Sequence, residues 1–313
     1  MNLTTDLLHI APEVRAALDD GRAVVALEST ITTHGLPRPD NLHAARAAEA
    51  SVRAAGAVPA TVATRDGRIR VGLEAEELAA LAAAEGIPKV SRQNLAAVLT
   101  SSGWGGTTVS ATMIAASLAG IEVFATGGIG GVHRGGEASM DISADLDELA
   151  RTPVTVVCAG PKSILDVGRT LEALETRGVP VVGWQSDEVA GFYSRSSGHR
   201  APSRVDSADQ AAHLIAIQRA LGLATGILVT VPLPPDLALP DEEVAAAVEQ
   251  AEAGAAKAGI HGPASTPFVL GRVAALTGGR SVRANLALIE RDAGVAGLIA
   301  VALADQRRAA GAT

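Results

Sequence analysis

Residues 122–137 read EVFATGGIGGVHRGGE, and this stretch decides the kind of fold we expect. An apolar, β-rich run leads directly into a loop with six glycines. Similar apolar runs recur along the chain and alternate with longer helical patterns, and most of them lack polar alternation, as is typical of strands covered on both faces. The predicted strands are 23–28, 60–63, 68–71, 122–125, 154–158, 179–183 and 226–231. The predicted helices are 40–53, one around 95–98, 107–118, 144–149, 163–176, 208–221, 241–258, 266–276 and 281–303.

Strands that alternate with helices predict an α/β fold, a three-layer α/β/α sandwich. Asp66-Gly67 between two β-rich runs predicts a hairpin, so the central sheet should be mixed. Asp40 and Ser91 are candidate helix caps. Because no linker rich in Ser, Pro or Gly divides the chain, we expect residues 1–313 to form a single domain.

Composition excludes several classes of protein. The 313 residues are 48% apolar and 19% charged, which rules out disorder as the dominant state. A net charge of −8 argues against nucleic acid or an anionic membrane as a partner. The lone Cys158 excludes an intramolecular disulfide and a Cys-rich zinc site, and we expect it to be packed inside its strand. With no signal-peptide pattern at the N-terminus and no apolar run of about 18 residues, a soluble, cytoplasmic protein is expected.

Polar clusters follow the predicted strands at their carboxyl ends, where open α/β sheets bind ligands. Glu28 closes an apolar strand, so burial could raise its pKa and make it a general acid; equally, it could accept backbone hydrogen bonds from the hydroxyl-rich loop that follows. The glycines of 127–136 could bring backbone N–H groups to an anion, or could simply allow a tight chain reversal. The His-Arg-Glu that interrupts them favours a phosphate or metal loop.

Two further clusters supply a carboxylate and an amine. In 141–146, Ser143 can cap a helix and Asp145 can stabilise its first turn, which leaves Asp141 as a candidate ligand for Mg²⁺ or Mn²⁺. Lys162 follows a buried strand where a helix is predicted to begin, and a helix N-terminus disfavours a cation. Lys162 is therefore either a nucleophilic amine or an ordinary surface lysine.

Five long motifs resemble the pseudouridine-5'-phosphate glycosidases, also called indigoidine synthase A-like proteins, and the similarity runs from about residue 23 to 300. The motifs are LESTITTHGLPRPDN (27–41), GAVPATVATRDGRIRVGL (56–73), GGTTVSATMIAASLAGIEVFATGGIGGVHRG (105–135), MDISADLDEL (140–149) and VCAGPKSILDVGRTLEALET (157–176).

The resemblance implies reversible cleavage of pseudouridine 5'-phosphate to uracil and ribose 5-phosphate, an α/β/α fold, a divalent cation, usually Mn²⁺, and a homotrimer. It implies that Glu28 is the acid, that Asp141 binds the metal and that Lys162 forms an imine with the ring-opened ribose. The matching substrate-binding positions are Lys89, Val109, Ser143, Ala144 and Asp145.

The chain departs from the family pattern at Pro263 and at Arg291-Asp292, where peripheral phosphate contacts or substrate preference are in question. Two other functions stay open on the sequence: a ribokinase-like sugar kinase, and a sugar-phosphate-binding protein without catalysis. The kinase would need a nucleotide site, and the binding protein would have no need of Lys162.

Overall fold

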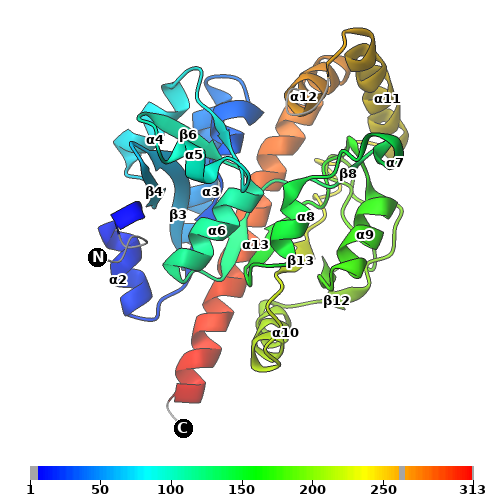
Figure 1. The fold of residues 1–313 in the computed structure, drawn as a ribbon. Coiled ribbons are helices and arrows are strands. Elements are labelled where there is room, and N and C mark those ends of the chain that lie inside the picture. The colour runs from blue at the N-terminus through cyan, green and yellow to red at the C-terminus, as the bar shows by residue number, and fades with distance from the viewer. Residues whose placement is uncertain (1–5, 261–264, 312–313) are drawn as a thin grey trace.

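An eleven-stranded mixed sheet forms the centre of the computed structural model, which describes residues 6–260 and 265–311 (Figure 1). Its main strand order is β1-β4-β3-β2-β7-β9-β13-β11-β12, with β6 beside β3 and β5 beside β6. The strands are β1 (Leu8–Ile10), β2 (Val24–Leu27), β3 (Val58–Arg65), β4 (Arg68–Val71), β5 (Lys89–Val90), β6 (Trp104–Thr107), β7 (Val123–Ala125), β9 (Thr155–Cys158), β11 (Val181–Trp184), β12 (Ser203–Val205) and β13 (Ile227–Thr230). A separate antiparallel pair joins β8 (Val132–His133) and β10 (Leu165–Asp166).

The middle of the sheet is parallel, and the predicted hairpin makes one side of it antiparallel. Strand β2 pairs in parallel with β3 and β7, and β9 pairs in parallel with β7 and β13. Strands β3 and β4 are antiparallel around Asp66 and Gly67, both of which have positive φ. Asp-Gly favours this turn because both residues tolerate the left-handed backbone region, so the prediction of a mixed sheet is confirmed.

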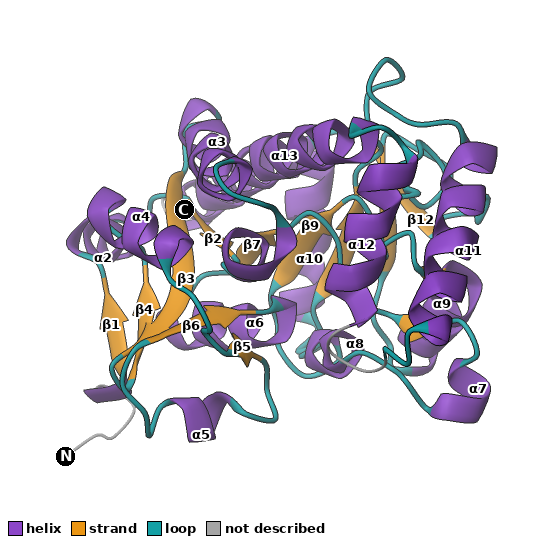
Figure 2. Cartoon of the chain, turned by 90° about the horizontal axis from the view of Figure 1, so that it is seen from above, coloured by secondary structure: helices purple, strands orange, loops and turns teal. Residues whose placement is uncertain are grey.

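Helices cover both faces, which confirms the three layers (Figure 2). Alternate residues of β2 point to different cores: Val25 and Leu27 to one, Val24 and Ala26 to the other. The first core is covered by α3 (Asp40–Ala54), α10 (Ala208–Ala220), α11 (Asp241–Lys257), α12 (Ser265–Leu276) and α13 (Arg280–Gly311). The second is covered by α2 (Pro12–Asp19), α6 (Val109–Ala119), α8 (Ala144–Leu149) and α9 (Val167–Thr176). Short elements complete the chain: η1, a π-helical turn (Ile31–Gly35), α4 (Ala75–Ala83), α5 (Leu95–Val98) and α7 (Gly136–Ser139).

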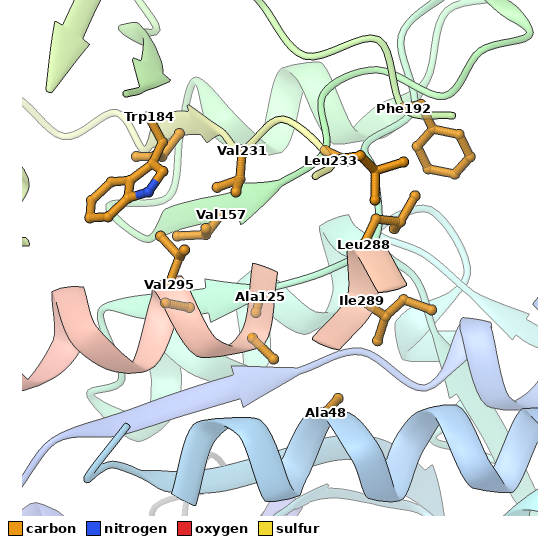
Figure 3. Close-up of a cluster of buried hydrophobic side chains, with 14 of the residues drawn as sticks. Ala48, Ala125, Val157, Trp184, Phe192, Val231, Leu233, Leu288, Ile289 and Val295 are labelled. Atoms are coloured by element: carbon orange, nitrogen blue, oxygen red, sulfur yellow. The ribbon is translucent and has the colours of Figure 1, made fainter. Parts of the chain in front are cut away.

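Helix α13 runs the length of the first core, and small residues let it approach its neighbours. A Cβ at Gly297 would lie 2.6 Å from the Cβ of Ala55, just beyond α3. Toward the other end, Leu288 and Ile289 pack in the cluster that contains Ala125 and Val157 (Figure 3). In the described ranges, none of the helices, α13 included, is long and apolar enough to cross a membrane.

Two predicted helix caps are wrong. Asp40 is the first residue of α3, and Pro39 occupies the cap position without a side-chain hydrogen bond. Ser91 does not cap α5, because Asn94 precedes that helix and its Oδ1 accepts the Ser91 N–H at 2.8 Å. A local turn closed by an amide side chain thus competes with helix initiation at Ser91.

The departure at Arg291-Asp292 lies in and beside the core. Arg291 Nε donates to the carbonyl oxygen of Pro232 at 3.0 Å. Asp292 is 1% exposed, and burial raises its pKa well above the ordinary range, opposed by the backbone of Ala159 and by the charge of Arg291. The other departure, at Pro263, lies outside the described residues.

We predict that Asp292 makes the protein less stable as pH rises. The folded state keeps a proton that the unfolded chain releases above the ordinary Asp pKa, so the free energy of unfolding should fall by up to about 1.4 kcal/mol per pH unit until the raised pKa is reached. Asp292→Asn should remove this loss. Urea unfolding at about pH 5.5 and about pH 8.5 measures it. The exposed Asp236→Asn serves as control, and an equal pH dependence in wild type and Asp292→Asn would contradict the prediction.

Candidate active site

Three neighbouring parallel strands bring the predicted site together. Strands β2, β7 and β9 are adjacent in the sheet and run in the same direction. Their carboxyl ends carry Glu28, the glycine loop and the segment that contains Lys162. These groups line two connected compartments, one polar and one apolar, which share Glu28, Thr30, Lys89 and Lys162.

Glu28 lies buried where the compartments meet. Desolvation raises its pKa, opposed by the positive charge of Lys162 and by the hydroxyl of Thr126, which donates to Glu28 Oε1. Two hydroxyls of the following loop bond elsewhere: Thr30 Oγ1 donates to the Thr107 carbonyl at 2.7 Å, and Ser29 Oγ accepts the Thr107 N–H at 2.9 Å. This environment favours the interpretation of Glu28 as an acid, since a raised pKa keeps a carboxyl group protonated at higher pH.

Lys162 is not at a helix N-terminus, which corrects the prediction of a helix from residue 163. Helix α9 begins at Val167, and Asp166 caps it by accepting the Arg169 N–H at 2.9 Å. Lys162 lies in the turn between β9 and β10, and its own N–H donates to the Ile129 carbonyl at 3.1 Å. The position is nevertheless not that of a surface lysine, because the side chain is only partly exposed and lines both compartments.

Lys89 provides a second amine. It belongs to β5, and it lines both compartments. Burial lowers the pKa of Lys89, and the charge of Lys162 lowers it further, while Glu28 and Asp145 act in the opposite direction. The site of this acidic protein therefore holds two amines close to one buried acid.

The glycine loop packs against its surroundings, and three of its amides bond within the protein. The Gly130 N–H donates to Asp145 Oδ2 at 2.8 Å, the Ile129 N–H to the Gly160 carbonyl, and the Val132 N–H to Thr170 Oγ1. The prediction of an anion-binding loop is therefore wrong for these three amides. The glycines instead allow close approach, since a Cβ at Gly130 would lie 2.2 Å from Ser143 Oγ.

Asp145 fixes the loop to the polar compartment. Its Oδ1 accepts the Ser110 N–H at 3.1 Å, so the two oxygens join the first turn of α6 to the glycine loop. Ser143 caps α8 as predicted, accepting the Asp145 N–H at 3.2 Å. The Asp145 carboxylate thus has a structural part to play, whatever contact the residue makes with substrate.

The polar compartment has a volume of about 430 Å³. All five positions assigned to substrate binding by resemblance line it, as does Asp141. No sequence pattern pointed to Gln93, Asn94 and Thr108, which line it too and come from the loop after β5 and from just beyond the end of β6. Only the pairing of β5 with β6 places those segments side by side.

The apolar compartment is much smaller, about 50 Å³. Ile31, Phe192 and Leu270 form apolar parts of its wall, together with Gly127 and Gly128. Two polar groups also line it. Asn285 is buried and its Oδ1 has no hydrogen-bond partner in the described chain, and His34 lies beside Thr33, whose hydroxyl is 2.7 Å from Nδ1. Burial and the charge of Lys89 lower the pKa of His34.

Asp141 lies at the rim of the polar compartment, where a wider cavity of about 720 Å³ begins. His133 and Ile164 border both spaces. The segment follows α7, so it does not begin at the end of a sheet strand as predicted. Among the described residues there is no group of three or more His, Cys, Asp or Glu that could enclose a metal.

Cys158 is not part of the reactive set. It is fully buried in β9, and burial raises the pKa of its thiol. This confirms the expectation of a packed side chain.

Comparison with known proteins gives a consistent family. Residues 13–302 match the family described as "Indigoidine synthase A like protein". The chain is 56% identical to a pseudouridine-5'-phosphate glycosidase of Methylobacterium nodulans, covering 96% of this chain and 89% of that protein. It is 55% identical to the enzyme of that name from Paracoccus denitrificans, covering 95% and 99%.

Solved structures show the same fold. A prealnumycin C-glycosynthase in complex with ribulose 5-phosphate is 38% identical, with a TM-score of 0.90 over 97% of this chain and 99% of that one. An indigoidine synthase A-like protein of Thermotoga maritima is 35% identical, with a TM-score of 0.86 over 95% and 97%. The fold and site therefore define a sugar-phosphate enzyme of the α/β class. The chain belongs to the indigoidine synthase A-like family, whose relatives above are named pseudouridine-5'-phosphate glycosidases.

We predict that Asp145→Asn destabilises the protein by about 1–3 kcal/mol, because an amide NH₂ replaces one of two oxygens that each accept a buried backbone N–H. Urea unfolding measures the loss. Asp147→Asn in the same helix is the matched control: it breaks a partly exposed ion pair with Arg177 and should cost less than about 1 kcal/mol. Equal losses in the two variants would remove the structural part assigned to Asp145.

Proposed function

We propose that this chain reversibly cleaves the C–C glycosidic bond of pseudouridine 5'-phosphate through an imine between Lys162 and ring-opened ribose. The observation that carries the proposal is the buried acid Glu28 beside two lysines, at the point where a polar and an apolar compartment meet. A sugar phosphate and a planar base need two such environments, one on each side of the bond that breaks. The names of the relatives support the same substrate.

The two compartments determine the orientation of the bound substrate. In our proposal, the phosphate lies in the polar compartment, close to Lys89, Ser143 and the first turn of α6 at Val109. The uracil ring lies in the apolar compartment, where the unpartnered Oδ1 of Asn285 can accept an N–H of the pyrimidine. C1' of the ribose then lies beside Glu28 and Lys162.

Opening of the ribose ring is the first step. The carboxylic acid of Glu28 donates its proton to the ring oxygen O4', the C1'–O4' bond breaks, and the amine of Lys162 forms a bond to C1'. The raised pKa of Glu28 supports this role, because the acid must be protonated when ring opening begins.

Cleavage of the C–C bond follows. The nitrogen lone pair of Lys162 forms the C=N bond as the C1'–C5 bond breaks, and the bonding pair passes to uracil C5, which accepts a proton. Water then hydrolyses the imine and releases ribose 5-phosphate. An amine is needed because a carbon leaving group lacks the lone pair that is protonated in ordinary glycoside hydrolysis.

The choice between the two amines rests on sequence and surroundings. Lys162 occupies the position of the family's AGxKSILD motif, next to the glycines that line the base compartment. Lys89 is followed by Ser91 and Asn94, which line the polar compartment alone, and this suits a lysine that binds phosphate.

We include a divalent cation, Mn²⁺ or Mg²⁺, in the proposal. The donor set fits a cation that keeps most of its waters, because Asp141 offers one carboxylate at the rim of a polar cavity and small hard cations are commonly held by one or two carboxylates. When bound, such an ion orders water and stabilises negative charge on oxygen. Asp141 would hold it.

A homotrimer and a cytoplasmic location complete the proposal, as the family resemblance implies. The two alternatives are less consistent with the site. A kinase would need a phosphate loop, whereas three amides of the glycine loop bond within the protein, and a simple binding protein would not need a buried acid beside two amines.

Borohydride trapping tests the proposal. With ribose 5-phosphate, whose open form is an aldehyde, borohydride should reduce the imine, inactivate the enzyme and add one reduced sugar phosphate to its mass. Peptide mapping should place the adduct on Lys162. Lys162→Ala should give neither adduct nor turnover, whereas Lys89→Ala should still be trapped at raised sugar concentration. An adduct on Lys89 would reassign the nucleophile.

We predict that Glu28→Gln lowers kcat by about 10²–10⁴-fold at unchanged thermal stability, since it removes the proton donor. In the wild type, kcat/KM should fall as pH rises through the elevated pKa of Glu28. Thr126→Val, which removes the hydroxyl that donates to Glu28, should shift this fall to higher pH. A loss of only a few-fold in Glu28→Gln would leave Glu28 a structural residue.

Asp141→Ala should abolish stoichiometric Mn²⁺ binding, measured by titration of the chelated protein and followed by the Mn²⁺ spin-resonance signal. The unfolding midpoint without metal should not change, because the side chain is partly exposed. His133→Ala at the same rim serves as control. Unaltered Mn²⁺ affinity in Asp141→Ala would exclude this carboxylate as the ligand.

A further inference from the structure

We propose that Phe192 determines the size of the ring that the enzyme can remove or attach, by restricting the apolar compartment to a single six-membered ring. The inference rests on the proposed function and adds a specificity residue to it. Phe192 is 2% exposed and belongs to the wall of the apolar compartment, but it does not line the polar compartment. In Figure 3 its ring lies at the end of the core cluster, near Leu233 and Leu288.

The backbone of Phe192 is held in an unfavourable conformation. Its φ is +65°, a region that bulky residues rarely occupy. The Phe192 N–H donates to the Ala159 carbonyl at 3.0 Å, three residues before Lys162. A Cβ at the intervening Gly160 would lie 2.4 Å from the Ala190 carbonyl oxygen, so the two loops are in close contact. Strain of this kind persists only where the surroundings determine the conformation, and it is concentrated at functional sites.

The ring is fixed on two sides. A Cβ at Gly128 would lie 2.6 Å from Phe192 Cε2, so the ring edge lies directly against this glycine. The Tyr193 ring lies 4.6 Å away between centroids, inclined by 56°. Tyr193 is itself buried, so turning the Phe192 ring toward it would displace a second buried ring.

A rigid wall around a small compartment excludes bases that are larger than the compartment. The apolar compartment measures about 50 Å³, against about 430 Å³ for the polar compartment that receives the sugar phosphate in our proposal. A second ring fused to the base would extend toward the wall, where Phe192 and Leu270 lie. Removing the phenyl ring should enlarge the apolar compartment on this side and leave Glu28 and the two lysines unchanged.

The test uses the synthetic direction with two acceptors that share one nucleophilic carbon. 4-Hydroxy-2-pyridone is monocyclic, and 4-hydroxy-2-quinolone is the same ring with a fused benzene. C3 of either acceptor attacks the C1' imine carbon, the C3 proton is lost to solvent, and ring closure releases the lysine. The net reaction with ribose 5-phosphate gives a C-riboside phosphate and one water, measured by mass.

Wild type should couple uracil and the pyridone but not the quinolone. Phe192→Ala should raise the ratio of quinolone to uracil product about tenfold or more. Phe192→Gly is the second variant, because glycine tolerates the positive φ and should fold even if alanine does not. Leu233→Ala, a buried change in the same core cluster outside the compartment wall, should leave the ratio unchanged.

An unchanged ratio in both Phe192 variants, or an equal rise in Leu233→Ala, would overturn the inference. Failure of the proposed function looks different: wild type would then give no C-nucleoside from uracil and ribose 5-phosphate. In that event calorimetric binding of the quinolone and the pyridone still tests Phe192, since only the variants should bind the quinolone.

Discussion

Asp145 accepts a backbone N–H from Gly130 with one oxygen and from Ser110 with the other, and the geometry of the site depends on this pair of bonds. They join the glycine loop after β7 to the first turn of α6. The close fit between Gly130 and Ser143 adds a steric constraint at the same point. Because Lys162 N–H donates to Ile129 in that loop, its position follows from the same arrangement.

Electrostatics then follow from burial. Glu28 lies in a desolvated position that raises its pKa, and the neighbouring lysines moderate the effect without removing it. The same burial lowers the pKa of Lys89. A buried acid that tends to stay protonated, beside the amine of Lys162, is the combination that ring opening and imine formation require. Burial thus changes both pKa values in the direction of the uncharged form: it raises that of Glu28 and lowers that of Lys89.

Part of the site was predictable from sequence because it depends on strand ends. One apolar strand stops at Glu28 and another stops just before Lys162, which predicts that both residues lie at the same edge of the sheet. The neighbouring strands β2, β7 and β9 form that edge. The helix start at Lys162 was wrong because Asp166 caps α9 later, after a short strand that local pattern does not reveal. Strand β6, which contains Trp104, was likewise missed, since its glycines lack β propensity and it is stabilised by pairing with β3 and β5.

The sequence by itself determined the α/β class, the mixed sheet and the family, because these are encoded in local apolar patterns, in Asp66-Gly67 and in long contiguous motifs. The tertiary structure alone decided that the glycine loop bonds to Asp145, that Lys89 lies beside Lys162, and that Phe192 and Asn285 line the same small compartment. The residues of each pair are separated by between 15 and 93 positions in the chain. Their proximity, and hence their charge state and chemistry, comes from strand order and packing, which no local pattern specifies.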